Sequence, residues 1–152
     1  MKLAYLIEAS GTYQKMIQQH LQQLGFEVRS FVTASECLRK LQQKPDLILL
    51  SQQLENDEKG TDFIRHFKNK IDNVPVVVLS NEGDVYTGVM ALKLGAMDYI
   101  EKNGAALVRL RTAIDGIPDF LRQQRRKRLL RWMIGIAALS VLVAAIWMGR
   151  VM

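Results

Sequence analysis

Residues 45–51 read PDLILLS, in which a proline and an aspartate are followed by four large aliphatic residues and a serine. A continuous apolar run of this kind is typical of a strand that is buried on both faces, as strands in parallel sheets are. Residues 74–80 read VPVVVLS, which repeats the pattern and is rich in β-branched residues. Two buried strands that each end on a serine predict a parallel sheet with polar side chains emerging at its carboxyl edge.

Segments typical of strands alternate with segments typical of helices along the first 115 residues. The helical segments place apolar residues three and four positions apart, and Gly25 and Gly95 mark the ends of two of them. We therefore expect an α/β fold, a doubly wound five-stranded parallel sheet with helices on both faces. Strands are expected at 3–7, 26–31, 45–50, 74–80 and 97–100, and helices at 13–24, 35–43, 61–67, 85–94 and 107–114.

The positive charge of the chain is concentrated near its C-terminus. The 152 residues carry a net charge of +6, and seven basic residues with no acid lie between positions 122 and 150. Removing these seven from the 21 basic residues leaves 14 against 15 acidic residues, so the basicity is not a property of the α/β domain. Cys37 is the sole cysteine, which excludes an internal disulfide and fits a reducing compartment.

An uncharged stretch of 18 residues, Trp132 to Gly149, predicts a membrane-spanning helix. At 1.5 Å per residue it is about 27 Å long, close to the ~30 Å hydrocarbon core of a bilayer. Trp132 and Trp147 lie near its two ends, where indole rings favour the membrane interface. Pro118 interrupts the preceding helix, because proline lacks the N–H donor. We therefore expect an α/β domain at 1–115, a basic juxtamembrane stalk at 116–131 and a transmembrane helix at 132–149; a buried core helix is the alternative.

The segments 45–50, 74–80 and 91–102 together resemble the receiver domain of bacterial response regulators. The third reads ALKLGAMDYIEK, and its GA-x-D-Y-x-x-K pattern is specific in this context. The resemblance covers about residues 2–115. It implies a signalling domain in which an aspartate that ends the third strand is phosphorylated with the help of Mg²⁺, which two acids after the first strand also bind.

The resemblance assigns a role to each polar residue at the strand ends. The phosphoacceptor position holds Ser51, and the acid pair is reduced to Glu8 and Ala9. Ser80 and Lys102 match the residues that bind phosphoryl oxygens, and Tyr99 matches the aromatic residue that rotates in response.

This chain departs from the family at the positions that carry the chemistry. Mg²⁺ requires anionic oxygen ligands, and Ser51 and Ala9 remove two of the three carboxylates. A serine cannot form an acyl phosphate. We therefore expect no conventional aspartyl phosphorylation, no metal, no cofactor and no enzymatic activity, and we expect Lys102 to pair with Glu8. Whether another kinase modifies Ser51 is left open.

Two functions from different classes fit these residues. The first is a phosphorylation-independent pseudo-receiver, a membrane-tethered interaction, regulatory or scaffold subunit of a bacterial signalling or membrane complex, whose protein partner docks near residues 84–115. The alternative is a membrane-anchored sensor that binds a small anion or nucleotide through Lys102 and the loop at Ser10. Helix capping by Ser10 or Thr12 explains that loop more simply. The sequence does not identify the partner or the oligomeric state.

The basic stretch before the apolar segment predicts the orientation of the chain. Basic residues that flank a span mark its cytoplasmic side, so the N-terminal domain is expected in the cytoplasm and the helix in the bacterial inner membrane. A nucleic-acid patch is the alternative, and the adjacent span argues against it. The residues concerned are Arg122, Arg125, Arg126, Lys127, Arg128 and Arg131.

Overall fold

The computed structural model describes residues 1–151. The chain divides into two compact units, the first at Met1–Ile117 and the second beginning at Pro118.

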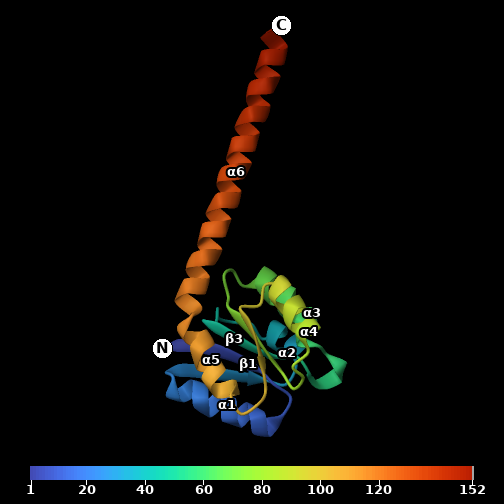
Figure 1. Cartoon of the computed structure of the whole chain (residues 1–152), viewed down its shortest axis with the longest axis vertical. Coiled ribbons are helices and arrows are strands. Elements are labelled where there is room, and N and C mark those ends of the chain that lie inside the picture. The colour runs from blue at the N-terminus through green and yellow to red at the C-terminus, as the bar shows by residue number, and fades with distance from the viewer. Residues whose placement is uncertain (152) are drawn as a thin grey trace. The chain divides into compact units, whose positions relative to one another are not determined.

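The first unit is built on a five-stranded parallel sheet, as predicted (Figure 1). The strand order is β2-β1-β3-β4-β5, so the chain winds first to one side of β1 and then to the other. This order brings the ends of β1, β3 and β4 together in the middle of the sheet, where Ser51 is in register with Leu79. The strands are β1 Lys2–Ile7, β2 Phe26–Phe31, β3 Leu47–Ser51, β4 Val76–Ser80 and β5 Asp98–Glu101.

Helices cover both faces of the sheet. Alternate residues of β3 face opposite layers: Leu47 and Leu49 pack under α1 and α5, whereas Ile48 and Leu50 pack under α2, α3 and α4. The two layers are visible on the two sides of the sheet in Figure 1. The helices are α1 Gly11–Gln23, α2 Ala34–Arg39, α3 Gly60–Lys70, α4 Val85–Lys93 and α5 Ala106–Asp115, with a short 3₁₀ turn, η1, at Glu55–Asp57.

The second helix is shorter than the sequence predicts. It was expected to reach Gln43 but ends at Arg39. The hydroxyl of Tyr5 donates a hydrogen bond of 2.8 Å to the backbone carbonyl of Gln43. Pro45 also disfavours helical backbone in the residue before it. Both effects draw residues 40–45 out of the helix and toward β3.

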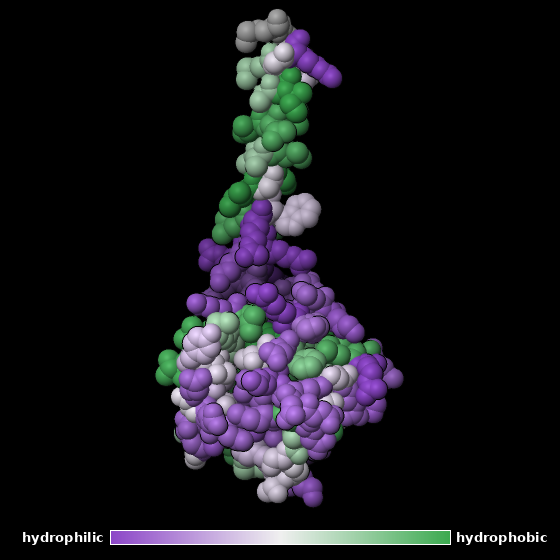
Figure 2. Space-filling view, turned by 90° about the vertical axis from the view of Figure 1, so that its right-hand side faces the viewer, coloured by the Kyte–Doolittle hydropathy of each residue, from purple (hydrophilic) through white to green (hydrophobic). Residues whose placement is uncertain are grey.

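The second unit consists of one long helix, α6 Ile117–Val151. It begins directly after Gly116, and Pro118 lies in its first turn, where the missing N–H leaves no bond unmade. In the part of the chain that the structure describes, Ile117–Arg150 is the helix long and apolar enough to cross a membrane. Figure 2 shows a charged, purple segment of this helix followed by an apolar, green one. The helix is therefore a candidate membrane anchor.

Candidate functional site

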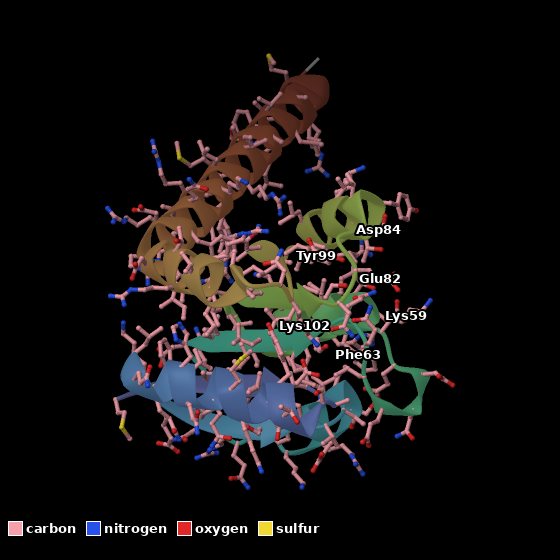
Figure 3. The ribbon with its side chains drawn as sticks, turned by 60° about the horizontal axis from the view of Figure 1, so that its bottom comes forward. Lys59, Phe63, Glu82, Asp84, Tyr99 and Lys102 are labelled. Carbon is pink, nitrogen blue, oxygen red and sulfur yellow. The ribbon has the colours of Figure 1, made fainter. Side chains whose placement is uncertain are left out.

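The carboxyl ends of β1, β3 and β5 bring Glu8, Ser51 and Lys102 together. The ammonium Nζ of Lys102 lies 2.5 Å from Oε2 of Glu8 and donates a 2.9 Å hydrogen bond to Oγ of Ser51. The side chains of Lys102 and Glu8 are only 6% and 2% exposed. The lysine that in the resemblance binds phosphoryl oxygens is therefore bound to two groups of its own chain. Lys102 is labelled in Figure 3.

Further contacts enclose this cluster. The ring of Tyr13 lies 4.8 Å from the ammonium of Lys102, within the range of a cation–π interaction. Burial, and then the negative charge of Glu8, raise the pKa of Tyr13. The other carboxylate oxygen of Glu8 accepts a 2.9 Å hydrogen bond from the backbone N–H of Ser10, and the hydroxyl of Ser51 donates to the carbonyl of Gln53. The pocket is closed by its own side chains and backbone.

Ser80 and Tyr99 both contact the loop between β4 and α4. The buried hydroxyl of Ser80 accepts a 3.2 Å hydrogen bond from the N–H of Glu82, whose carbonyl accepts a 2.8 Å bond from the hydroxyl of Tyr99. The ring of Tyr99 packs on Gly88 of α4, where an added Cβ would lie 3.1 Å from Cδ1 of the ring. Tyr99 therefore attaches the β4–α4 loop to β5, whereas Ser80 bonds locally at the start of that loop.

Two of the acids considered as replacements for the missing carboxylates, Glu58 and Asp46, are bound elsewhere. The carboxylate of Glu58 accepts a 2.7 Å hydrogen bond from the N–H of Ala34 and another from the hydroxyl of Ser35, which holds it at the start of α2. Asp46 lies at the amino end of the sheet, where it accepts a 2.8 Å bond from the N–H of Leu3. Ala9 follows Glu8 in the loop after β1 and carries no ligand atom.

A cleft of about 360 Å³ lies beside the cluster, between the β3–α3 and β4–α4 loops. Its lining includes Asp57, Glu58, Glu82 and Asp84, against one cation, Lys59. Lys59, Glu82 and Asp84 are labelled in Figure 3. The hydrogen bonds from Thr87, chiefly from its hydroxyl, lower the pKa of Asp84, so that carboxylate is charged at neutral pH. The excess of carboxylates makes the cleft unfavourable for an anion.

The side chains that could bind a metal ion do not cluster in the described part of the chain. Among residues 1–151, no group of three histidine, cysteine, aspartate or glutamate side chains lies close enough together to hold a metal ion. The absence of a metal remains a prediction, as does the role of each site residue.

The predicted membrane-flanking residues all lie on α6. Their side chains, Arg122, Arg125, Arg126, Lys127, Arg128 and Arg131, are exposed. Arg122 also pairs with Asp119 at 2.8 Å, one turn earlier.

Sequence reasoning missed two residues at the cluster. Tyr13 was placed on the apolar face of its helix by periodicity alone, which did not indicate that its ring lies next to Lys102. Gly60 approaches the backbone of Ser51 so closely that an added Cβ would lie 2.4 Å from the Ser51 carbonyl oxygen. An isolated glycine at the start of a helix hints at such a close approach, but the sequence does not show to which atom.

Comparisons with known proteins agree with this fold. The family profile described as response regulator receiver domain matches residues 5–115. An NtrX-like response regulator of Rickettsia felis is 28% identical over 99 residues, which are 64% of this chain and 21% of that protein. The transcriptional regulatory protein CssR of Bacillus subtilis is 30% identical over 98 residues, 64% of this chain and 43% of that protein.

A solved structure supports the same fold. The crystal structure of NtrX from Brucella abortus aligns with a TM-score of 0.72 at 24% identity, over 85% of this chain and 30% of that one. At this identity the likeness concerns the fold alone. This chain spans less than half the length of the two curated relatives named above.

Proposed function

This chain belongs to the response regulator receiver domain family, and from that premise we propose that it is a membrane-tethered pseudo-receiver, a docking module that works without aspartyl phosphorylation. The observation that carries the proposal is the buried pair of Glu8 and Lys102, which also binds the hydroxyl of Ser51. Glu8 and Lys102 match two groups that take part in phosphoryl transfer in other receivers, and in this chain they bind each other.

The chemistry of the cluster supports this reading. The hydroxyl of Ser51 accepts a hydrogen bond from Lys102 and donates one to the backbone carbonyl of Gln53, which is not a general base that could activate it. The one carboxylate that remains of the magnesium set, Glu8, is already neutralised by Lys102. A divalent cation would have to compete with a buried ammonium for a single carboxylate, and Mg²⁺ gives up its water only for a more anionic site.

The surface at residues 84–115 supports a docking role. Most of the exposed large apolar side chains of Met1–Ile117 lie in this range. Val85 and Tyr86 at the start of α4 are 78% and 72% exposed, and Val108 on α5 is 70% exposed. Clustered apolar side chains on a soluble surface commonly mark protein-interaction sites. We propose that a protein partner binds here, and that the module is a regulatory or scaffold subunit of a signalling or membrane complex.

The C-terminal helix supplies the tether in this proposal. A span at 132–149 with basic residues before it places the receiver domain in the cytoplasm, at the inner membrane. Attachment to the same membrane raises the effective concentration of the domain for a membrane-bound partner. Docking is then set by location and not by phosphorylation.

The ligand-sensor alternative has less support. Lys102 is 6% exposed and bound to Glu8 and Ser51, so an anion would first have to break a buried ion pair. The charged side chains that line the open cleft beside it are four carboxylates and one lysine. Neither place favours a phosphate or a nucleotide.

The first test uses the full chain in detergent with acetyl phosphate and Mg²⁺. We expect no acid-labile phosphate on the protein, because the acceptor position lacks a carboxylate. Stoichiometric acid-labile labelling would contradict the pseudo-receiver proposal.

The second test locates the docking surface by photocrosslinking in native membranes. A photoreactive phenylalanine analogue at Tyr86 should capture a discrete protein partner. The same analogue at Met16, which is 39% exposed on α1, is the matched control and should not. Equal capture at both positions would mean that residues 84–115 are not the docking surface.

A further inference from the structure

Six cations form a basic collar on α6, defined here as Arg122, Arg125, Arg126, Lys127, Arg128 and Arg131. Their side chains are exposed. No acid lies between the first and last of them, and Trp132 follows directly. The purple segment of the helix in Figure 2 contains this collar.

The collar surrounds the helix instead of lying along one face. Successive residues of an α-helix are about 100° apart, so the four consecutive cations Arg125–Arg128 cover roughly 300° of its circumference. Along the axis the same four residues rise only about 4.5 Å. The polar layer on each side of a bilayer is about 5–7 Å thick. The charge is thus arranged as a ring about as deep as one headgroup layer.

This arrangement distinguishes between classes of anionic partner. A nucleic acid or an acidic protein approaches a helix from one side and would leave half of the ring unused. A headgroup layer surrounds a spanning helix and meets all of it. Five of the six cations are arginines, whose planar guanidinium donates paired hydrogen bonds to phosphate oxygens.

We propose that the basic collar binds the phosphates of anionic phospholipids and enriches them around the helix. The inference rests on the membrane span of the proposed function. Asp119 offsets part of the charge of Arg122, with which it pairs. The C-terminal helix then determines which lipids lie next to it as well as which membrane the receiver domain is attached to.

The test reconstitutes the full chain in vesicles that contain brominated lipids, which quench nearby tryptophans. The chain has two tryptophans, so Trp147→Phe leaves Trp132 as a reporter directly beside the collar. At equal mole fraction, brominated phosphatidylglycerol should quench Trp132 about two- to fivefold more than brominated phosphatidylcholine, because each cation near the surface favours an anionic lipid about fivefold. Salt at 1 M, where the Debye length is about 3 Å, should remove most of the excess.

Variants separate the collar from the span. In the Trp147→Phe background, Arg125→Gln, Arg126→Gln and Arg128→Gln together should lower the excess, because three of the six cations remain. Arg125→Lys, Arg126→Lys and Arg128→Lys together should keep it. Trp132→Phe leaves Trp147 as a reporter of insertion, which either brominated lipid should quench. If Trp147 is quenched but both lipids quench Trp132 equally, the collar proposal is overturned and the span stands. If Trp147 is not quenched by either lipid, the span itself is overturned. If an equimolar short DNA duplex removes the excess quenching of Trp132 by phosphatidylglycerol, the collar binds nucleic acid and the lipid proposal is overturned.

Discussion

The ammonium of Lys102 lies 2.5 Å from the carboxylate of Glu8, and both side chains are almost completely buried. A buried pair of this kind stabilises little relative to an apolar pair, but removing one partner leaves a buried charge unpaired. Glu8 directly follows β1 and Lys102 directly follows β5, so this contact links the ends of the two strands, and its loss should destabilise the domain.

The first prediction concerns this pair. Glu8→Gln in residues 1–117 should lower the free energy of unfolding by about 3–5 kcal/mol, because the ammonium of Lys102 stays buried without its counter-charge. Urea unfolding followed by circular dichroism measures the change. The double variant Glu8→Gln with Lys102→Met should recover part of the loss. Glu36→Gln is the matched control, because Glu36 pairs with Lys40 at the surface and should matter little.

An unchanged urea midpoint in Glu8→Gln would show that the pair does not hold the strand ends together. The ion pair with Glu8 would then not prevent Lys102 from binding another group.

The second prediction is a gain of chemistry. Ala9→Asp combined with Ser51→Asp adds two carboxylates beside Glu8, which supplies the anionic oxygens that Mg²⁺ requires. The double variant should take up acid-labile phosphate from acetyl phosphate in the presence of Mg²⁺, and the wild-type chain should not. A phosphate-affinity gel measures both. Labelling that persists after removal of Mg²⁺ would mean that the new carboxylates do not act by binding Mg²⁺.

The fold and part of the site follow from the sequence because both depend on strand periodicity. Five apolar runs predict a parallel sheet, and the carboxyl ends of its strands meet, so the pairing of Glu8 with Lys102 was expected and is observed. The resemblance to receivers supplied the identity of the acceptor position at Ser51.

The rest depends on loop conformations that periodicity does not determine. Glu58, in the loop after β3, binds the start of α2, which its position in the sequence does not predict. Its placement follows a turn in which Asn56 and Asp57 both adopt positive φ, at 59° and 58°. Short polar residues tolerate this conformation, but the sequence does not state that two in succession adopt it. The position of Tyr13 over Lys102 likewise depends on the angle at which α1 packs.

The third prediction compares two glycines that each begin a helix. Gly60→Ala should destabilise the domain by about 1–3 kcal/mol, because the added Cβ would lie 2.4 Å from the Ser51 carbonyl oxygen. Gly11→Ala at the start of α1 has no atom within 4 Å of the new Cβ. It should be neutral or stabilising by up to about 1 kcal/mol, as helix propensity predicts. Thermal unfolding of residues 1–117 measures both, and effects of the same sign would contradict the close approach at Gly60.

The fourth prediction concerns Cys37. Burial, with a smaller contribution from Glu36, raises the pKa of this thiol from 9.0 to about 12. The folded state therefore keeps the proton after the unfolded state has lost it, so this contribution to stability is present below pH 9 and declines between pH 9 and about 12. A thiol reagent at pH 8 should label Cys37 in urea and leave it unlabelled in the native protein. Rapid native labelling would contradict its burial.

The fifth prediction concerns the C-terminal helix. The full chain should resist extraction from membranes by alkaline carbonate, whereas a chain that ends at Ile117 should be released, because the apolar segment is the sole candidate span within the described residues. Arg125, Arg126 and Arg128 changed together to Glu should reverse or prevent insertion, since basic residues keep the flanking segment on the cytoplasmic side. Protease protection of the N-terminal domain in vesicles measures the orientation. If the orientation is unchanged but the variant no longer retains nucleic acid, these arginines bind a polyanion and do not determine the orientation of the helix.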